Sequence, residues 1–450
     1  MMDIAPILRA VASVCLLCTA AAAAAASLTD LDDRFQLEAD GFYRALARKQ
    51  PQSPAESLQA YSKALAAADP VSAGAIVRAN QTLLQAHYQS AAFRDALVRS
   101  YALNDTATVR EFTRFIDAKG DPVAIADNYF ALAKYYYARG NWPGVAAALS
   151  QVDGKQLDVS DAQYAELLRG YALQAQKKHR KAMTHYRQIP ASSTYYPYLK
   201  LNLGTAYLRQ GWWTDAHAEF KAALAAAAGN PELQNRIRVT LGFSQIHNEF
   251  YRDARKTLRK VPLGTALTNK ALLGLGVAAA FEGDYAGAEN AFARLTEEAS
   301  VDQNVDEAYL LLAQVRAERH GANAAQSFRA AIGHFEQRLT ELSEARQALA
   351  DAVAASALDL IARFDARAQQ LYAGSVSPLP QYARDNYRHL LDMTERAARL
   401  DLPVDLGGFL NEFDAALKAQ MDDSLAQRES VLQSYLSQAK LGVAKLYDAP

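Results

Sequence analysis

Apolar residues recur every three to four positions along most of the chain, which is the spacing of one face of an α-helix. Runs of alternating β-branched residues, which indicate strands, are absent from the sequence. The pattern predicts amphipathic helices at 31–49 and 55–68, and more helices up to about residue 118. Near the other end it predicts one long helix from Phe335 to Tyr372 and two further helices, at about 381–400 and 408–446. We therefore expect an all-α protein.

The middle of the chain repeats itself at intervals of 34 to 38 residues. Each unit has a small residue, a second mostly small residue 12 positions later, and a large residue 16 positions after the first. The first small residues are Ala133, Gly170, Gly204, Gly242, Gly276 and Ala313. The second residues are Val145, Ala182, Ala216, Ala254, Ala288 and Ala325. The large residues are Leu149, Tyr186, Phe220, Leu258 and Phe292, with Arg329 out of pattern in the last unit.

A pair of helices explains this spacing. A small residue on each helix lets the two backbones approach, and a larger residue fills the groove beside that contact. Glycines at 140, 211 and 283 indicate the turn between the helices, whereas Lys177 and Glu249 stand at this position in two units. One hairpin cannot bury its apolar face alone, so successive hairpins must stack.

These residues resemble a known family. The segment from Leu203 to Tyr207, followed by Gly211, Ala216 and Phe220, closely resembles the tetratricopeptide repeat (TPR), and six units agree in register. The resemblance implies a right-handed α-solenoid of TPR hairpins, with the first helix of each hairpin lining the concave side. We expect four parts: 1–26 a signal peptide, 27–120 degenerate repeats or a helical cap, 121–335 the solenoid, and 336–450 a C-terminal long-helix domain. Tyr61 and Ala64 are placed as on a second repeat helix.

The N-terminus has the order of a secretory signal. Arg9 precedes an apolar run ending at Cys18, and alanines follow up to a cleavage position near Ala26–Ser27. Both cysteines lie within this segment, so the mature chain has no thiol and suits an oxidising compartment. We expect a periplasmic protein. Asp3 is unusual in such a segment, which leaves an uncleaved N-terminal anchor as the alternative.

Composition and motifs argue against catalysis. The formal net charge of -1 gives no basic excess for nucleic acid, and membrane contact is expected only through partners. No phosphate-binding loop or helical pair of metal-binding histidines is found, and Gly274 and Gly276 are explained by close helix packing. We therefore expect no enzyme activity, no catalytic or metal site and no cofactor.

A protein-binding groove is the remaining hypothesis. Aromatic and cationic residues, which are frequent in binding hot spots, recur on the first helices. The candidate residues are Tyr164, Tyr171, Tyr198, Arg209, Arg236, Phe243, His247, Lys270 and Phe281. For aromatic members such as Tyr164, Phe243 and Phe281, packing between repeats is an equal alternative. The expected partner is an extended peptide or helix of an envelope protein, bound by a non-enzymatic scaffold. The alternative is a structural subunit of an envelope machine for energy transduction, secretion or exopolysaccharide export, with its contacts on the C-terminal helices.

Overall fold

The computed structural model describes residues 22–49, 69–81, 85, 88–297, 302–352 and 379–447. These residues form helices and no strand, so the all-α prediction is confirmed. The chain divides into two compact units. Among the described residues, those of the N-terminal unit lie within Ala23–Tyr196 and Leu379–Leu417, and those of the central unit lie within Pro197–Pro378 and Lys418–Pro450. Most of the expected signal peptide, Tyr61, Ala64 and the end of the predicted long helix lie outside the described residues.

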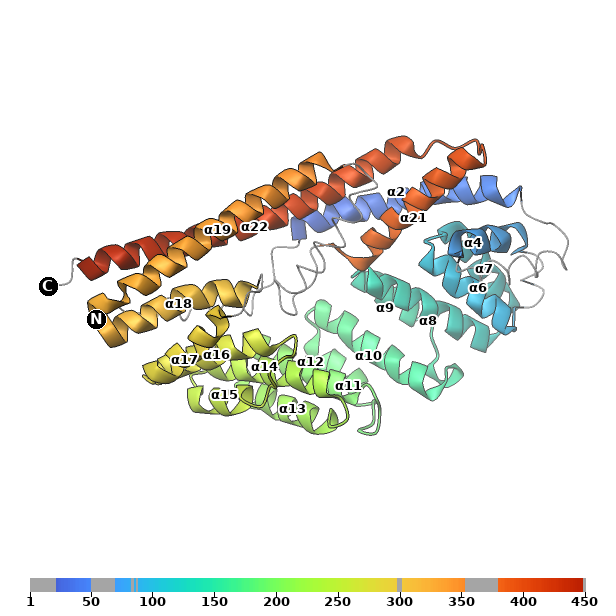
Figure 1. The fold of residues 1–450 in the computed structure, drawn as a ribbon. Coiled ribbons are helices and arrows are strands. Elements are labelled where there is room, and N and C mark those ends of the chain that lie inside the picture. Colours follow the sequence, from blue (N-terminus) through green and yellow to red (C-terminus); the bar gives the residue numbers. More distant parts are fainter. Residues whose placement is uncertain are drawn as a thin grey trace. The chain divides into compact units, whose positions relative to one another are not determined.

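Six helical hairpins follow the predicted repeat (Figure 1). Their helices are α8 (Pro122–Ala138) with α9 (Trp142–Leu149), α10 (Val159–Ala175) with α11 (His179–Tyr186), α12 (Tyr196–Arg209) with α13 (Trp213–Ala226), α14 (Pro231–His247) with α15 (Tyr251–Leu258), α16 (Thr268–Phe281) with α17 (Tyr285–Thr296), and α18 (Gln303–His320) with α19 (Ala325–Asp351). A 3₁₀ turn, η1 (Gly154–Gln156), separates the first two hairpins, and η2 (Gly321–Ala324) lies within the last.

The glycines of the first helices pack as predicted. A Cβ added at Gly204 would lie 2.5 Å from the Phe220 ring, and one added at Gly276 would lie 2.7 Å from Cδ1 and Cζ of Phe292. Gly242 and Leu258 make the same contact in the hairpin between them. The small residue of one helix therefore accommodates the large residue of its partner, which fixes the register of each hairpin.

The turn between the two helices needs a left-handed backbone. Glycine supplies it at Gly140, Gly211 and Gly283, with φ between 67° and 76°. Lys177 and Glu249 occupy the same position with φ of 60° and 64°. A residue with a Cβ adopts this conformation at a cost of about 1–2 kcal/mol. These two units therefore keep the turn although they lack its usual residue.

The last hairpin differs from the predicted register. At the start of its second helix, Ala324, Phe328 and Ala331 are buried, whereas Arg329 is exposed and donates a hydrogen bond to the Tyr447 hydroxyl over 2.7 Å. The assignment of Ala325 and Arg329 to the packing positions was therefore wrong by one residue. The reason is local: η2 runs directly into α19 and shortens the connection, so the second helix starts its packing one position earlier.

The helices predicted near the C-terminus are present as α21 (Gln381–Arg399) and α22 (Gly407–Tyr447). In the central unit, α22 lies along α19 (Figure 1). The Phe335 and Tyr435 rings are 5.8 Å apart, and Gly442 packs against Phe328. The described part of the predicted long helix belongs to α19, which is also the second helix of the last hairpin.

The N-terminal unit also contains α2 (Ala22–Ala47), α4 (Pro70–Ala79), α6 (Ala91–Ala102) and α7 (Thr106–Lys119), together with α21. One buried carboxylate joins four of its segments. Asp32 on α2 accepts hydrogen bonds from Asn104 Nδ2 at 3.0 Å, Arg139 Nε at 3.0 Å and Asn386 Nδ2 at 2.6 Å. These donors lie in the α6–α7 connection, at the end of α8 and on α21. A buried charge with several partners is costly to disturb, so Asp32 stabilises this arrangement.

Candidate functional site

Two consecutive first helices of the central unit present an exposed polar and aromatic face. On α12, Tyr198 and Arg209 are exposed, and Tyr198 has 41% of its surface accessible. On α14, Arg236 and His247 are exposed. The two α12 residues are 11 positions apart and so are the two on α14, which places each pair on one side of its helix. The predicted residues on α12, and Arg236 and His247 on α14, therefore remain available to a partner.

The two arginines of this face carry charge that is not neutralised within the described chain. Neither Arg209 nor Arg236 forms an ion pair with a described residue. His247, by contrast, has an aromatic neighbour, because its ring lies 5.1 Å from the Trp213 ring. We call Tyr198, Arg209, Arg236 and His247 the α12–α14 face.

Phe243 lies on the same side of α14 but does not reach solvent. Its side chain is 6% exposed and packs in the core formed with α16, where a Cβ added at Gly274 would meet its ring at 3.2 Å. Lys270 approaches the Phe243 ring with its ammonium 5.7 Å from the centroid. For Phe243 the packing alternative therefore holds. Replacing Phe243 by alanine is therefore expected to destabilise this core.

Phe281 is also held by a neighbour. Its ring stacks on Tyr251 with the centroids 4.9 Å apart and the planes 9° from parallel. Together with the buried Val277, this makes the corresponding side of α16 more apolar and less accessible than that of α12 or α14. The exposed polar face of α12 and α14 therefore does not continue onto α16.

On α18 the equivalent side is buried and charged. Asp306 accepts a hydrogen bond from His334 and forms an ion pair with Arg428 of α22, which is 5% exposed. Burial would raise the pKa of Asp306, but His334 and Arg428 hold it below its ordinary value. Burial raises the pKa of the adjacent Glu307 to about 7, and the charge of Arg428 opposes that shift. This end of the array is therefore closed by α22.

The two predicted residues of the N-terminal unit lie among other rings. Tyr164 stacks on Tyr195 with centroids 5.2 Å apart and meets Phe130 edge-on at 6.0 Å. Tyr171 lies 6.2 Å from Tyr137. Both are half-buried. Burial raises the pKa of the Tyr164 hydroxyl.

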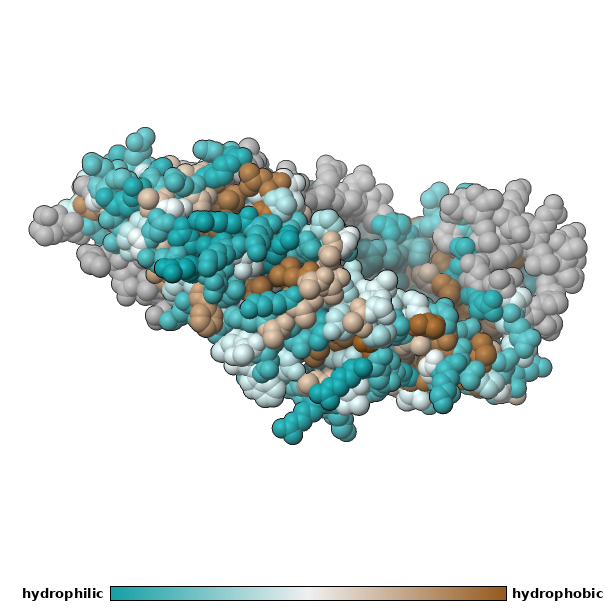
Figure 2. Space-filling view, turned by 90° about the horizontal axis from the view of Figure 1, so that it is seen from below, coloured by the Kyte–Doolittle hydropathy of each residue, from teal (hydrophilic) through white to brown (hydrophobic). Residues whose placement is uncertain are grey.

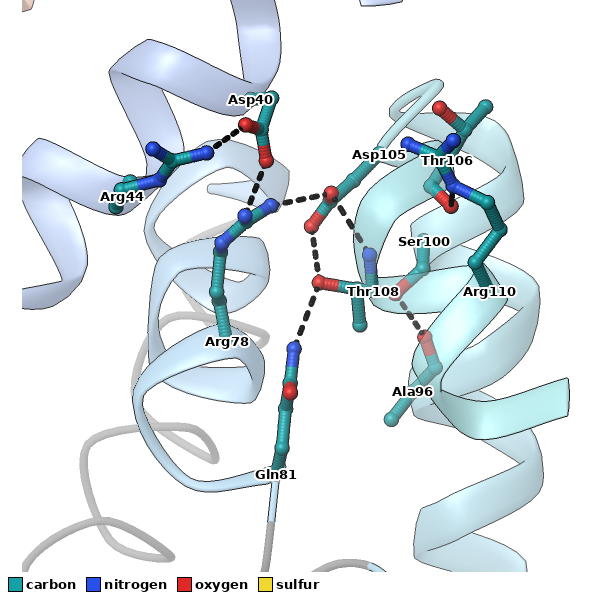
Figure 3. Close-up of polar contacts among 10 residues, drawn as sticks. All are labelled: Asp40, Arg44, Arg78, Gln81, Ala96, Ser100, Asp105, Thr106, Thr108 and Arg110. Atoms are coloured by element: carbon teal, nitrogen blue, oxygen red, sulfur yellow. Dashed lines mark hydrogen bonds and ion pairs between the residues drawn. The ribbon is translucent and has the colours of Figure 1, made fainter. Parts of the chain in front are cut away.

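An arginine-rich hollow in the N-terminal unit was not predicted. It has a volume of about 510 Å³, and its walls include Arg44, Arg48, Arg78, Arg110 and Arg114. Figure 3 shows Arg78 between Asp40 and Asp105, with Arg44 also on Asp40. Asp105 accepts a backbone hydrogen bond from Thr108 at the start of α7. Sequence spacing gives no signal for this cluster, because its residues come from three helices separated by unrelated segments.

The described residues give two further results. They contain no group of three or more histidine, cysteine or acidic side chains arranged to hold a metal ion. They also contain no helix that is long and apolar enough to cross a bilayer.

The similarity of this chain to known proteins is weak. No family model matches the chain, and no curated protein matches it. Among solved structures, a tetratricopeptide repeat protein from Parabacteroides merdae is 14% identical, with a TM-score of 0.36, over 70% of this chain and 99% of its own. The apo form of the quorum sensor NprR from B. thuringiensis is 13% identical, with a TM-score of 0.35, over 77% and 99%. A Rap protein complexed with Competence and Sporulation Factor is 12% identical, with a TM-score of 0.29, over 80% and 98%.

TM-scores this low support no functional conclusion. The assignment of the fold instead rests on the chain itself: a repeat of 34 to 38 residues, a small residue against a large one in each hairpin, and a left-handed turn between the helices. The chain is an all-α solenoid whose helical hairpins are of the tetratricopeptide-repeat type.

Proposed function

We propose that this protein is a non-enzymatic scaffold of the cell envelope that binds a segment of a partner protein on the α12–α14 face. The observation that carries the proposal is that the arginines Arg209 and Arg236, which are exposed and form no ion pair with a described residue, lie on the same side of α12 and α14 as the exposed ring of Tyr198 and the exposed His247. Arginine and tyrosine are enriched at binding hot spots, where the ring excludes water and the guanidinium selects oxygen acceptors.

The chemistry of this face indicates the type of segment. Two guanidinium groups favour a segment with carboxylate side chains, and Tyr198 with His247 favours an apolar or aromatic residue between them. An extended peptide or one side of a helix would present these groups along a line. Opposite charge also accelerates association, an effect that weakens as salt is added.

Export to the periplasm is part of the proposal and rests on the N-terminal sequence. Among the residues of α2 whose burial is described, the buried ones begin at Leu28. Cleavage after Ala26 would thus leave these core contacts in place. We expect mature protein to begin near Ser27 and to fractionate with periplasmic contents. Recovery of the intact N-terminus in the cytosol would contradict export without bearing on the binding face.

The test is affinity capture from envelope extracts, followed by mass spectrometry and titration of the protein obtained. The variant Arg209→Ala/Arg236→Ala should bind that protein about tenfold more weakly, which corresponds to about 1.4 kcal/mol. Both side chains are exposed, so the melting temperature should not change. Arg252→Ala is the control, because Arg252 is an exposed arginine on α15 outside the face.

The alternative is that the C-terminal helices make the main contact. Leu441 and Tyr447 on α22 are exposed apolar residues, with 54% and 68% of their surfaces accessible. Deleting α22 would not test this alternative, because the deletion would uncover Phe328 and break the Arg428–Asp306 pair. Leu441→Ser is the better change. If it abolishes binding while the double arginine variant binds normally, the α12–α14 face is not the binding site.

A further inference from the structure

A second basic hollow lies in the central unit, on the opposite side of α14 from the α12–α14 face. It has a volume of about 480 Å³ and is lined by residues of α13, α14, α15 and the turn after α15. Arg238 and Gln245 are two of its α14 residues. Arg238 comes two positions after Arg236, and Gln245 comes two positions after Phe243. Two positions turn an α-helix by about 200°, so the two sides face away from each other. We call this hollow the α13–α15 hollow.

The charges at this hollow are mostly uncompensated. Lys221, Arg238, Lys256 and Lys260 line it, with Asp253 as its one acidic lining residue among those described. Asp253 lies 3.7 Å from Lys256, and both side chains are more than half exposed, so their interaction is weak. Lys221 and Lys260 form no ion pair with a described residue.

Arg238 is held in place without losing its charge. Its Nη1 donates to Asn235 Oδ1 and its Nη2 to Gln234 Oε1, both over 2.9 Å. These acceptors are neutral amides. The arginine-rich hollow of the N-terminal unit is different, because there Arg78 is paired with the carboxylates of Asp40 and Asp105. In the α13–α15 hollow, the positive charge of Arg238 is therefore available to an anionic ligand. In the arginine-rich hollow, the charge of Arg78 is already balanced by two carboxylates.

The two buried lining residues, Leu241 and Gln245, form the floor of the hollow, and Gln245 supplies an independent observation. Gln245 is 7% exposed, and its Oε1 is buried without a hydrogen-bond partner. Leaving a buried polar atom unpaired is costly, and a bound ligand with a donor would remove that cost. Leu224 and Leu241 form the apolar part of the lining. Figure 2, which views the protein from the side of α13 and α15, shows a mainly hydrophilic surface with small apolar patches.

We propose that the α13–α15 hollow binds an acidic peptide segment that carries an apolar side chain. The carboxylates pair with the lysines and Arg238 at the rim, and the apolar side chain covers Leu224 and Leu241. A peptide N–H donates to Gln245 Oε1 at the floor. A peptide satisfies all three requirements, whereas a compact inorganic anion satisfies only the first. This contact goes beyond the proposed function, because it uses the opposite side of α14.

The experiment is a titration of the full-length protein with a capped hexapeptide of alternating glutamate and leucine. The matched hexapeptide of glutamine and leucine should bind at least tenfold more weakly, and added salt should weaken the acidic peptide. Lys221→Ala/Lys260→Ala should weaken the acidic peptide about tenfold. Arg259→Ala, which removes an exposed cation next to Lys260 but outside the hollow, should leave its affinity unchanged.

Gln245→Met tests the floor and separates binding from folding. Because the change removes an unpaired buried oxygen, the free protein should melt at a higher temperature while the peptide binds several-fold more weakly. Unchanged affinity in both Gln245→Met and the double lysine variant would overturn the proposal. Pyrophosphate binding as tightly as the acidic peptide, with the same variant dependence, would overturn it in favour of a small-anion site. Loss of peptide binding in Arg236→Ala alone would instead place the peptide on the α12–α14 face.

Discussion

The same substitution at two glycines of the central unit should have different effects on stability. Gly276 lies on α16 against Phe292, whose ring is fully buried, and an added Cβ would lie 2.7 Å from two ring atoms. Gly333 lies on α19, and no atom lies within 4 Å of its added Cβ. Alanine in place of glycine favours a helix interior by about 1 kcal/mol. At Gly333 this gain should appear in full. At Gly276 overpacking should oppose it by about 1–3 kcal/mol.

Both variants replace glycine by alanine inside a helix, so the gain in helix propensity is common to both and cancels in the difference between their free energies of unfolding. Gly333→Ala should raise the free energy of unfolding by about 1 kcal/mol, and Gly276→Ala should fall below it by about 1–3 kcal/mol. Both residues belong to one compact unit, so thermal and urea unfolding followed by circular dichroism reports on the same structure. If Gly276→Ala stabilises the protein as much as Gly333→Ala does, the small-against-large contact is not what sets the hairpin register.

Three other predictions concern stability. Lys177→Gly and Glu249→Gly should each raise the free energy of unfolding by about 1 kcal/mol in urea titrations, because glycine adopts the left-handed turn without strain; a destabilised variant would contradict the assigned turn. Asp32→Ala should cost about 3–5 kcal/mol in the same assay, since it leaves Arg139, whose side chain is 13% exposed, without its carboxylate and the buried amides of Asn104 and Asn386 without their acceptor, and a cost below about 1 kcal/mol would refute its role. Burial raises the pKa of Glu307 from 4.5 to about 7, so the folded protein binds a proton that the unfolded chain releases. Its contribution to stability is therefore present below pH 4.5 and is lost as the pH rises through 7; Glu307→Gln should flatten this part of the stability profile, and an unchanged slope would contradict the prediction.

The repeat could be predicted because its determinants are close in sequence. A small residue and its large partner are 16 positions apart, so Gly204 with Phe220 forms a pattern that recurs visibly along the chain. The last hairpin departs from this fixed spacing. Its connection is shorter by one residue, and an alignment that keeps the spacing fixed selects Arg329 instead of Phe328.

Contacts between distant segments were beyond sequence reasoning. Asp32 meets Asn386, and Asp306 meets Arg428, yet no periodicity relates these positions. Helical spacing also places Phe243 on the same side as Arg236 without showing that the neighbouring helix α16 covers the ring. The α13–α15 hollow was missed for the same reason, since Gln245 acquires its significance only from burial without a partner.

Site-specific photo-cross-linking in living cells tests the proposed binding face most directly. A photoreactive residue at Thr205 or Thr240 would lie on the side of α12 or α14 that carries the exposed arginines, and a matched one at Gly333 would lie on α19. We predict cross-links to the same partner protein from Thr205 and Thr240 and none from Gly333, with the yield reduced by Arg209→Ala/Arg236→Ala. Cross-links formed only from α22, for example at Leu441, would contradict it.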